Sequence, residues 1–229
     1  MVATVYDTPD AALEGIEDGV RVMFGGFVTA GTPSNLIRAL RRRGTRGILG
    51  MANNIGFGDL LDELCEDGQL AGMIATFAIR ASSAKKSRFE DQYRRGEVTL
   101  ELSPQGTFVE RIRAGGAGLG GVLTRTGLGT PVAEGKRTVE VQGVTYLLEE
   151  PLRADVALLK AQRADRLGNI EYRASGRNFN PIMAMAADLV IVEVEEIVEV
   201  GEIDPERVGT PAAFVDRIVQ CAPVQVFTP

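Results

Sequence analysis

Short apolar segments of strand length alternate along the chain with amphipathic segments of helix length, and this alternation is the strongest constraint on the fold. Strands are predicted at 20–24 and 47–52, each followed by a helix. Two further strands, at 156–159 and 189–194, enclose another helix. Strands that alternate with helices pair in parallel, because each helix carries the chain back across the sheet. We therefore predict an α/β fold, a single domain over residues 1–229 with an open, mainly parallel sheet flanked by helices.

The absence of histidine excludes several familiar kinds of active site. The 229 residues contain no His, and the two cysteines, Cys65 and Cys221, have neither CxxC nor zinc-ligand spacing. A Ser-His-Asp triad, a Cys-His pair and an imidazole metal site therefore cannot be built from this chain. We predict a reduced protein with two incidental thiols and no metal site. Its chemistry must use carboxylates, amides, hydroxyls or cationic side chains, or a group from another chain.

Charge and hydropathy limit the partners that the chain can have. A net charge of −6 argues against a general nucleic-acid surface. No apolar run approaches the roughly 20 residues that a membrane-spanning helix needs. The first residues carry neither the basic stretch nor the apolar core of an export signal. We therefore expect a cytoplasmic protein that binds neither nucleic acid nor membrane.

A glycine-rich loop lies between the first of these strands and the helix that follows it. The loop contains Gly25, Gly26, Phe27 and Gly31, and Thr32 after it is a candidate N-cap. Exposed backbone N–H groups and the positive end of the helix would suit an anion there. The loop lacks both the Lys of a Walker A motif and the glycine spacing of a dinucleotide fingerprint. The residues alone leave open whether this is an anion-binding loop or a tight structural turn.

The run from Asp18 to Pro33, DGVRVMFGGFVTAGTP, resembles the signature of the alpha, or A, subunit of family I coenzyme A transferases. That signature is an acidic or Asn residue with Gly or Asn, two free positions, three apolar residues, G-G-F, three free positions and G-x-P. Every fixed position is met. The resemblance continues over nearly the whole chain, in blocks at 53–56, 89–97, 101–118, 126–130, 165–169, 177–181, 193–195 and 201–205.

The resemblance implies a 3-oxoacid CoA-transferase, which moves CoA between an acyl-CoA such as succinyl-CoA and a 3-oxo acid such as acetoacetate. In this family a Glu of the beta subunit, within a Ser-Glu-Asn-Gly segment, forms a glutamyl-CoA thioester. This sequence contains no such segment. The resemblance therefore implies that the chain is half of an enzyme, active with a beta subunit in a heterodimer or heterotetramer. CoA thioesters would be substrates, and no permanently bound cofactor is expected.

The resemblance also implies which residues form the site. Gln105 would donate its side-chain amide to the negatively charged oxygen of the tetrahedral intermediate, from a loop before a helix that a capping box at Thr107 opens. Asn53 and Asn54 follow a predicted strand end, where α/β sheets place ligands. Their amides would hold the carboxylate of the acid, or they would close an Asx turn instead.

Further substrate contacts are expected at Gly25, Gly26, Phe27 and Gly31 in the glycine-rich loop, and at two glycines near residue 115. Gly115 and Gly116 could let the backbone approach the substrate or the partner subunit, or could only make a loop flexible. The segment 177–181 is assigned to packing or an interface. The acidic run 193–196 is predicted to be a solvated strand end.

Two departures from the common family pattern affect the choice of acid. Many members have Gly where this chain has Val28, and the segment 80–86 replaces one that contains Gly and Asn in 3-oxoacid transferases. A 3-oxoadipate or acetate CoA-transferase subunit is therefore an alternative. The resemblance also admits a subunit of a CoA-ester hydrolase with the same fold, since some relatives lack the nucleophile and let water attack. From a different class, a stand-alone α/β module that binds a nucleotide or sugar phosphate is also considered. For the half-enzyme we expect an exposed apolar patch that the partner covers.

Overall fold

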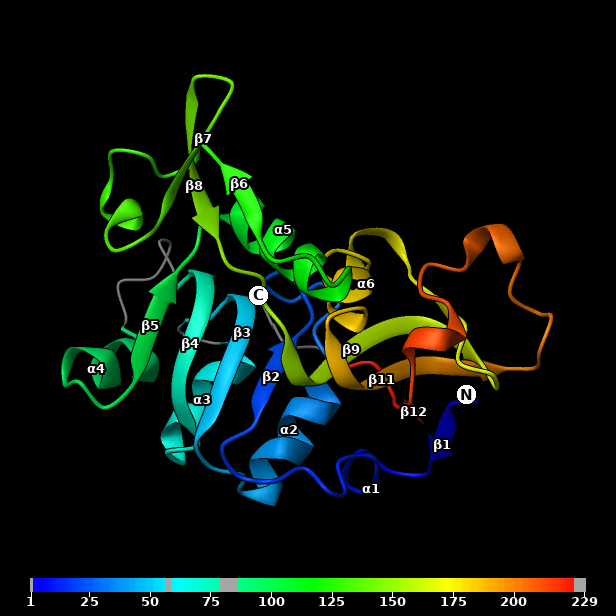
Figure 1. The fold of residues 1–229 in the computed structure, drawn as a ribbon. Coiled ribbons are helices and arrows are strands. Elements are labelled where there is room, and N and C mark those ends of the chain that lie inside the picture. The colour runs from blue at the N-terminus through cyan, green and yellow to red at the C-terminus, as the bar shows by residue number, and fades with distance from the viewer. Residues whose placement is uncertain (1, 57–58, 79–85, 225–229) are drawn as a thin grey trace.

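A computed structural model of the chain describes residues 2–56, 59–78 and 86–224. Its centre is an open sheet in which every neighbouring pair along the main path is parallel (Figure 1). In spatial order the strands are β1 (Thr4–Tyr6), β12 (Arg217–Gln220), β11 (Ala187–Val198), β9 (Ala154–Asp165), β2 (Arg21–Phe24), β3 (Ile48–Asn54), β4 (Leu70–Phe77) and β5 (Thr99–Leu102). The short β10 (Ile170–Glu171) pairs with β9 in the antiparallel sense. The predicted α/β class with a mainly parallel sheet is confirmed.

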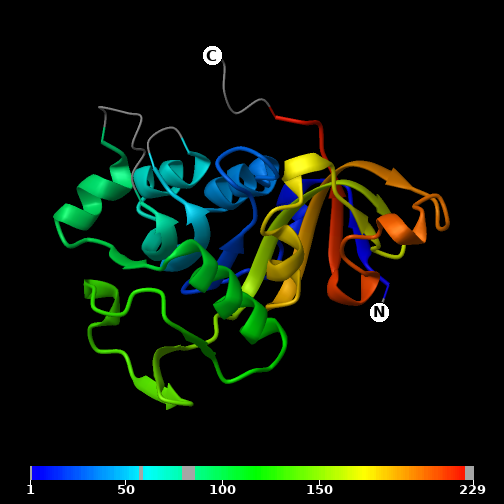
Figure 2. The same cartoon turned by 90° about the horizontal axis from the view of Figure 1, so that it is seen from above.

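Helices cover both faces of this sheet (Figure 2). One face carries α1 (Pro9–Ala12), α2 (Ser34–Arg43), α3 (Leu60–Glu66) and α4 (Arg88–Arg94), and the other carries α5 (Gln105–Gly116) and α6 (Asn180–Ala184). Successive strand residues point to opposite faces, so Phe24 packs in the first core and Met23 in the second. The two cores explain why the central strands are apolar throughout.

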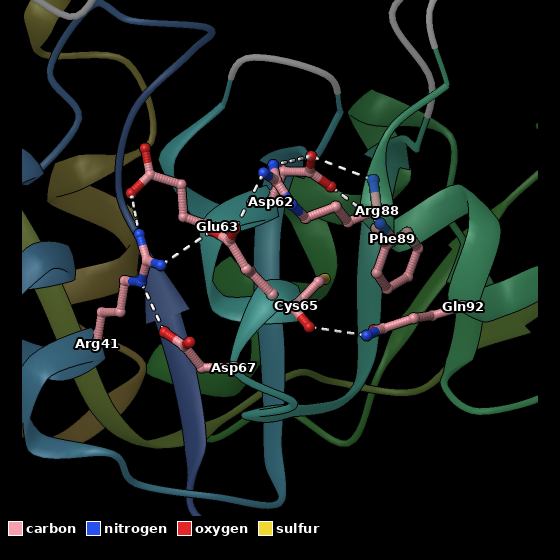
Figure 3. A network of polar contacts seen from close by, with 9 residues as sticks. Arg41, Asp62, Glu63, Cys65, Asp67, Arg88, Phe89 and Gln92 are labelled. Atoms are coloured by element: carbon pink, nitrogen blue, oxygen red, sulfur yellow. Dashed lines mark hydrogen bonds and ion pairs between the residues drawn. The ribbon is translucent and has the colours of Figure 1, made fainter.

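Polar contacts lock three helices of the first face, α2, α3 and α4, to one another (Figure 3). Arg41 near the end of α2 donates to Glu63 at 2.8 Å and to Asp67 at 2.7 Å. The buried carboxylate of Asp62 in α3 accepts from the backbone N–H of Phe89 in the first turn of α4, at 2.9 Å. Gln92 donates from α4 to the Cys65 carbonyl oxygen at 2.7 Å. The bond to Phe89 satisfies a backbone N–H in the first turn of α4. The bond to Cys65 adds a second contact to a carbonyl oxygen that also accepts from the Gly68 N–H at 3.1 Å.

A second, three-stranded sheet lies outside the main sheet. It is antiparallel, with strands β6 (Val122–Thr124), β8 (Val144–Glu149) and β7 (Thr138–Val141) in spatial order. The β7–β8 hairpin turns at Gln142 and Gly143, whose φ angles of 52° and 75° suit a tight hairpin turn. Short 3-10 helices complete the chain at Pro131–Ala133, Ala174–Gly176, Pro205–Arg207 and Ala212–Phe214. Within the described residues, none of the helices has the length and apolar character that a bilayer crossing requires.

The acidic run on β11 differs from its predicted role as a solvated strand end. Glu193 is buried, and its Oε2 accepts from the backbone N–H groups of Asn35 at 2.8 Å and Leu36 at 2.9 Å. These two N–H groups are orphan donors in the first turn of α2, which has no side-chain cap from Thr32. Residue 193 thus closes the start of a helix that lies far away in the sequence.

Candidate active site

Three segments meet where the strands end at one edge of the sheet. The glycine-rich loop follows β2, Asn53 and Asn54 are the last two residues of β3, and Gln105 follows β5 as the first residue of α5. Ligand sites of open α/β sheets lie at this carboxyl edge. The structure therefore brings together the side chains that the sequence singled out separately.

The side-chain amide of Gln105 is hydrogen-bonded to a buried side chain. Its Nε2 donates to Asn53 Oδ1 at 2.7 Å, and the Gln105 side chain is half-buried. Its predicted place in a loop before a Thr107 cap is wrong, because α5 already begins at Gln105, with Pro104 as its N-cap. The fixed φ of proline, here −54°, suits a helix start. Thr107 is instead a buried helical residue whose hydroxyl has no partner among the described residues.

The two asparagines continue this contact into a chain of amides. Asn53 Nδ2 donates to Asn54 Oδ1 at 3.2 Å, and the same oxygen accepts from the Val28 backbone N–H at 2.8 Å. Asn54 Nδ2 in turn donates to Asp59 Oδ2 at 3.0 Å. Each asparagine carbonyl oxygen thus accepts from a residue far away in sequence, Gln105 or Val28, and no bond of an Asx turn is found among the described residues. Asp59 is a member of this site that sequence reasoning missed, although its position directly before α3 was a possible signal.

The glycines of the loop allow two segments to interlock. A Cβ on Gly25 would lie 1.9 Å from Asn180 Oδ1, and a Cβ on Gly31 would lie 2.3 Å from the Gly176 carbonyl oxygen. Asn180 is fully buried and donates to the Gly31 carbonyl oxygen at 3.1 Å. The segment 177–181 therefore packs against the loop, as predicted. Gly26 has a φ of 113°, which a residue with a side chain rarely adopts.

The tip of the glycine-rich loop is exposed, while the start of α2, the helix that follows the loop, already binds a side chain of this chain. Phe27 and Val28 are 42% and 44% exposed, and Val28 has a φ of 56°, a strained value for a β-branched residue. The sequence indicated that the positive end of α2 could bind an anion. In the structure the Glu193 side chain accepts hydrogen bonds there. The chain itself thus supplies the anion that this helix end favours.

A cavity of about 850 Å³ opens between this edge, α5 and β6. Gln105 and Phe27 line it, together with Gly106, Thr107, Val109, Glu110, Arg113, Val122, Leu123, Thr124, Thr126, Asn178, Phe179 and Ile182. Its size is that of a small-molecule site. Asn53 and Asn54 instead line a separate space of only about 20 Å³, with room for a water rather than for an acid.

Two predicted contacts lie away from this cavity. Gly115 and Gly116 are in the last turn of α5, where a Cβ would lie 2.0 Å from the Leu152 carbonyl oxygen and 2.8 Å from Met185 Cβ, respectively. The structure therefore gives these glycines a packing role within the chain, and neither lines the cavity. Residues 80–85 of the divergent segment lie outside the described residues.

Few groups among the described residues could act as a nucleophile at this cavity. Burial raises the pKa of Cys65 and of Cys221 to about 12, so neither is a thiolate at neutral pH. Glu110 lines the cavity, but it is exposed and pairs with Arg113 at 3.1 Å. A primary amide carries two N–H groups, so Gln105 keeps one beyond its bond to Asn53. The arrangement can stabilise negative charge on a substrate oxygen better than it can supply an activated nucleophile.

Comparison with known proteins shows the family to which the chain belongs. The family model described as Coenzyme A transferase matches residues 6–221. The A subunit of 3-oxoadipate CoA-transferase from Pseudomonas putida is 46% identical over 220 residues, which cover 96% of this chain and 94% of that protein. The A subunit of succinyl-CoA:3-ketoacid coenzyme A transferase from Xanthomonas campestris pv. campestris (strain B100) is 47% identical over 216 residues, which cover 93% of this chain and 87% of that protein.

A solved structure has the same fold. Glutaconate coenzyme A-transferase from Acidaminococcus fermentans superposes with a TM-score of 0.84 at 22% identity, over 96% of this chain and 76% of that one. With the sequence matches over nearly the full length, this chain belongs to the coenzyme A transferase family. Its place there is that of the alpha-type subunit in a heteromeric transferase, since both sequence relatives above are A subunits.

Proposed function

We propose that this chain is the half of a 3-oxoacid CoA-transferase that stabilises negative charge during the reaction. The complete enzyme moves CoA from an acyl-CoA such as succinyl-CoA to a 3-oxo acid such as acetoacetate. The observation that carries the proposal is the side-chain amide of Gln105, which lines the cavity and is fixed by Asn53. The succinyl-CoA:3-ketoacid relative supports the choice of acids.

The nucleophile comes from a beta subunit, within its Ser-Glu-Asn-Gly segment. A carboxylate with an ordinary pKa near ~4.3 is ionised at neutral pH and needs no general base, which suits a site without histidine. It attacks the thioester carbonyl carbon, the C–S bond breaks, and CoA thiolate leaves an acyl-glutamyl anhydride. The thiolate then attacks the glutamyl carbonyl carbon and releases the first acid.

The resulting glutamyl-CoA thioester passes CoA to the second acid by the same two steps in reverse. Each attack places negative charge on a carbonyl oxygen. A donor aimed at that oxygen lowers the barrier, because it is already oriented when the charge develops. Gln105 supplies this donor from the alpha-type chain, and CoA thioesters are substrates with no permanently bound cofactor.

Exposed apolar side chains around the site support a partner that covers it. Phe27 and Val28 lie at the loop tip, Phe77 ends β4, Leu102 ends β5, and Leu123 lines the cavity, and all five are more than two-fifths exposed. An apolar surface at a catalytic edge is typical of a protein–protein interface. We therefore place the beta subunit over this edge, in a heterodimer or heterotetramer.

The choice of acid is tested with the reconstituted complex and succinyl-CoA as donor. We expect the highest kcat/KM with acetoacetate, compared with 3-oxoadipate and acetate. The similarity to a 3-oxoadipate CoA-transferase chain makes 3-oxoadipate the second candidate. Release of free CoA in the absence of any acceptor acid would instead indicate the hydrolase. The stand-alone phosphate-binding module loses its main support, because Glu193 occupies the start of α2.

A further inference from the structure

The amides of Asn54, Asn53 and Gln105 form one continuous line of hydrogen bonds with a defined direction. We propose that Asn53 and Asn54 are positioning residues, which orient the Gln105 amide rather than bind the carboxylate of the acid. This inference rests on the proposed function, since it assigns the two asparagines a role through Gln105. We name the set Asp59, Asn54, Asn53 and Gln105 the amide relay.

The direction of the amide relay is set at the end away from Gln105. The Val28 backbone N–H can only donate, so it requires the carbonyl oxygen of Asn54 on its side. On the other side, Asp59 Oδ2 accepts from Asn54 Nδ2 at 3.0 Å, as a carboxylate oxygen does. A reversed Asn54 amide would therefore set two donors against each other at Val28 and two acceptors against each other at Asp59.

The fixed Asn54 amide then dictates the orientation of the next two amides. The Asn54 side-chain oxygen accepts a hydrogen bond, so Asn53 must present its donor Nδ2 to it. The other atom of the Asn53 amide, Oδ1, therefore lies toward Gln105. Asn53 Oδ1 in turn accepts a hydrogen bond from Gln105 Nε2 at 2.7 Å, which fixes the orientation of the Gln105 amide. A reversed Gln105 would instead bring two carbonyl oxygens together at this distance. The second N–H of Gln105 is left for the cavity that its side chain lines.

Burial argues against the alternative in which the asparagines hold the acid. Asn53 is 1% exposed, and the space beside the two asparagines is about 20 Å³, compared with about 850 Å³ beside Gln105. A carboxylic acid therefore fits beside Gln105 and does not fit beside Asn53. The same low exposure strengthens the amide contacts, because water does not compete for them.

The test is a double-mutant cycle in the reconstituted complex, with acyl-CoA and acid varied in turn. Asn53→Ala should lower kcat about tenfold in the wild-type background, as expected for loss of one buried hydrogen bond. In the Gln105→Ala background the same change should lower kcat less than about twofold, because its effect passes through Gln105. The KM for the acid should stay within about twofold in both backgrounds.

A second variant covers the case in which Asn53→Ala does not fold. Asn54→Ala removes the residue that sets the direction, at a half-buried position, and should show the same dependence on Gln105. The matched control is Gln92→Ala. It removes the 2.7 Å hydrogen bond that the Gln92 side-chain amide in α4 donates to the Cys65 carbonyl oxygen in α3 (Figure 3). It should lower the melting temperature and leave kcat unchanged. Additive effects on kcat, or a raised KM for the acid at constant kcat, would overturn the proposal.

A spectroscopic measurement separates the amide relay from the proposed function. In the complex with only this chain isotope-labelled, the two side-chain N–H signals of Gln105 should differ strongly in chemical shift. In Asn53→Ala they should move to the values of a solvent-exposed glutamine, and in Gln92→Ala they should stay. Absence of CoA transfer by the wild-type complex would defeat the proposed function alone. Unchanged Gln105 signals in Asn53→Ala would defeat the relay, whatever the activity.

Discussion

Single residues decide both the chemistry and the local strain at the carboxyl edge of the sheet. Gln105 lines the cavity, and among the described residues its amide donates one hydrogen bond, to Asn53, so a second N–H is available to a substrate oxygen. Val28 lies at the tip of the neighbouring loop with a φ of 56°. In the proposed function the first residue acts on the transition state, and the second stores strain in the backbone.

Gln105→Ala should lower kcat of the reconstituted complex by about 10²-fold, because only the charge that develops in the transition state loses a donor. The melting temperature and the assembly with the partner should change little, since the side chain is half-buried and makes one hydrogen bond to the part of the chain that the structure describes. Steady-state kinetics, a melting curve and gel filtration measure these quantities. An unchanged kcat would remove Gln105 from the mechanism.

Val28→Gly should be more stable than Val28→Ala by about 1 kcal/mol, because glycine adopts a positive φ without the clash that a Cβ causes. The two variants remove the same exposed side chain beyond Cβ, so they differ mainly in backbone strain. Urea unfolding of both proteins gives the difference in free energy. If Val28→Ala were the more stable variant, the left-handed backbone at this position would be refuted.

At the scale of the elements, carboxylates from one element close the helix starts of another. Asp62 in α3 does this for α4, and Glu193 in β11 does it for α2. Burial raises the pKa of Glu193, although the backbone N–H groups of Leu36 and Asn35 and the charge of Lys160 act in the opposite direction. The raised pKa means that burial raises the pKa of Glu193 more than its hydrogen bonds and the charge of Lys160 lower it.

Glu193→Ala should destabilise the chain by about 2–4 kcal/mol, because it leaves the N–H groups of Asn35 and Leu36 without an acceptor. Glu193→Gln keeps an acceptor oxygen and should cost less. Thermal or urea unfolding of the three proteins measures the order. Equal losses in both variants would show that the side-chain oxygen does not matter to α2.

The raised pKa of Glu193 also predicts a pH dependence. The folded chain holds this proton more tightly than the unfolded chain, whose ordinary value is 4.5. The resulting stabilisation is complete below that value and is lost as the pH rises through the folded pKa. Relative to Glu193→Gln, the wild type should therefore lose stability when unfolding is followed from about pH 4 to about pH 8. A gain over this range would reverse the sign of the shift.

The elements show which features a single sequence can predict. Strands β2 and β3 with their helices follow from apolar runs and Gly or Pro signals that are local in the chain. The bond between Asn53 and Gln105 joins residues 52 positions apart, and the bond between Leu36 and Glu193 spans 157. No local pattern records such pairs, so the amide relay and the α2 cap could not be predicted. The resemblance identified Gln105, but local cap rules misplaced the start of its helix.

At the scale of the whole molecule, the chain presents a cavity beside exposed apolar side chains. Phe77 and Leu102 are exposed at the ends of β4 and β5, and the exposed Phe27 lines the cavity together with the amide of Gln105. Neither cysteine is reactive, and the carboxylate in the cavity, Glu110, is paired with Arg113. A second subunit that brings an unpaired carboxylate would complete both the surface and the chemistry.

The purified chain alone should therefore show no CoA transfer, and addition of the beta subunit should restore it. Mixing the separately purified subunits, with activity and gel filtration followed in parallel, tests this dependence. Robust turnover by this chain with no accompanying protein would contradict the division of the active site between two chains.

The most direct test of that division measures the intact mass of each chain after the complex is incubated with succinyl-CoA and no acceptor acid. The reaction then stops at the glutamyl-CoA thioester, with succinate released. The partner chain should gain the mass of CoA less one water, this chain should stay unchanged, and Gln105→Ala should slow the gain. A CoA adduct on this chain, at Glu110 or any other carboxylate, would contradict the account.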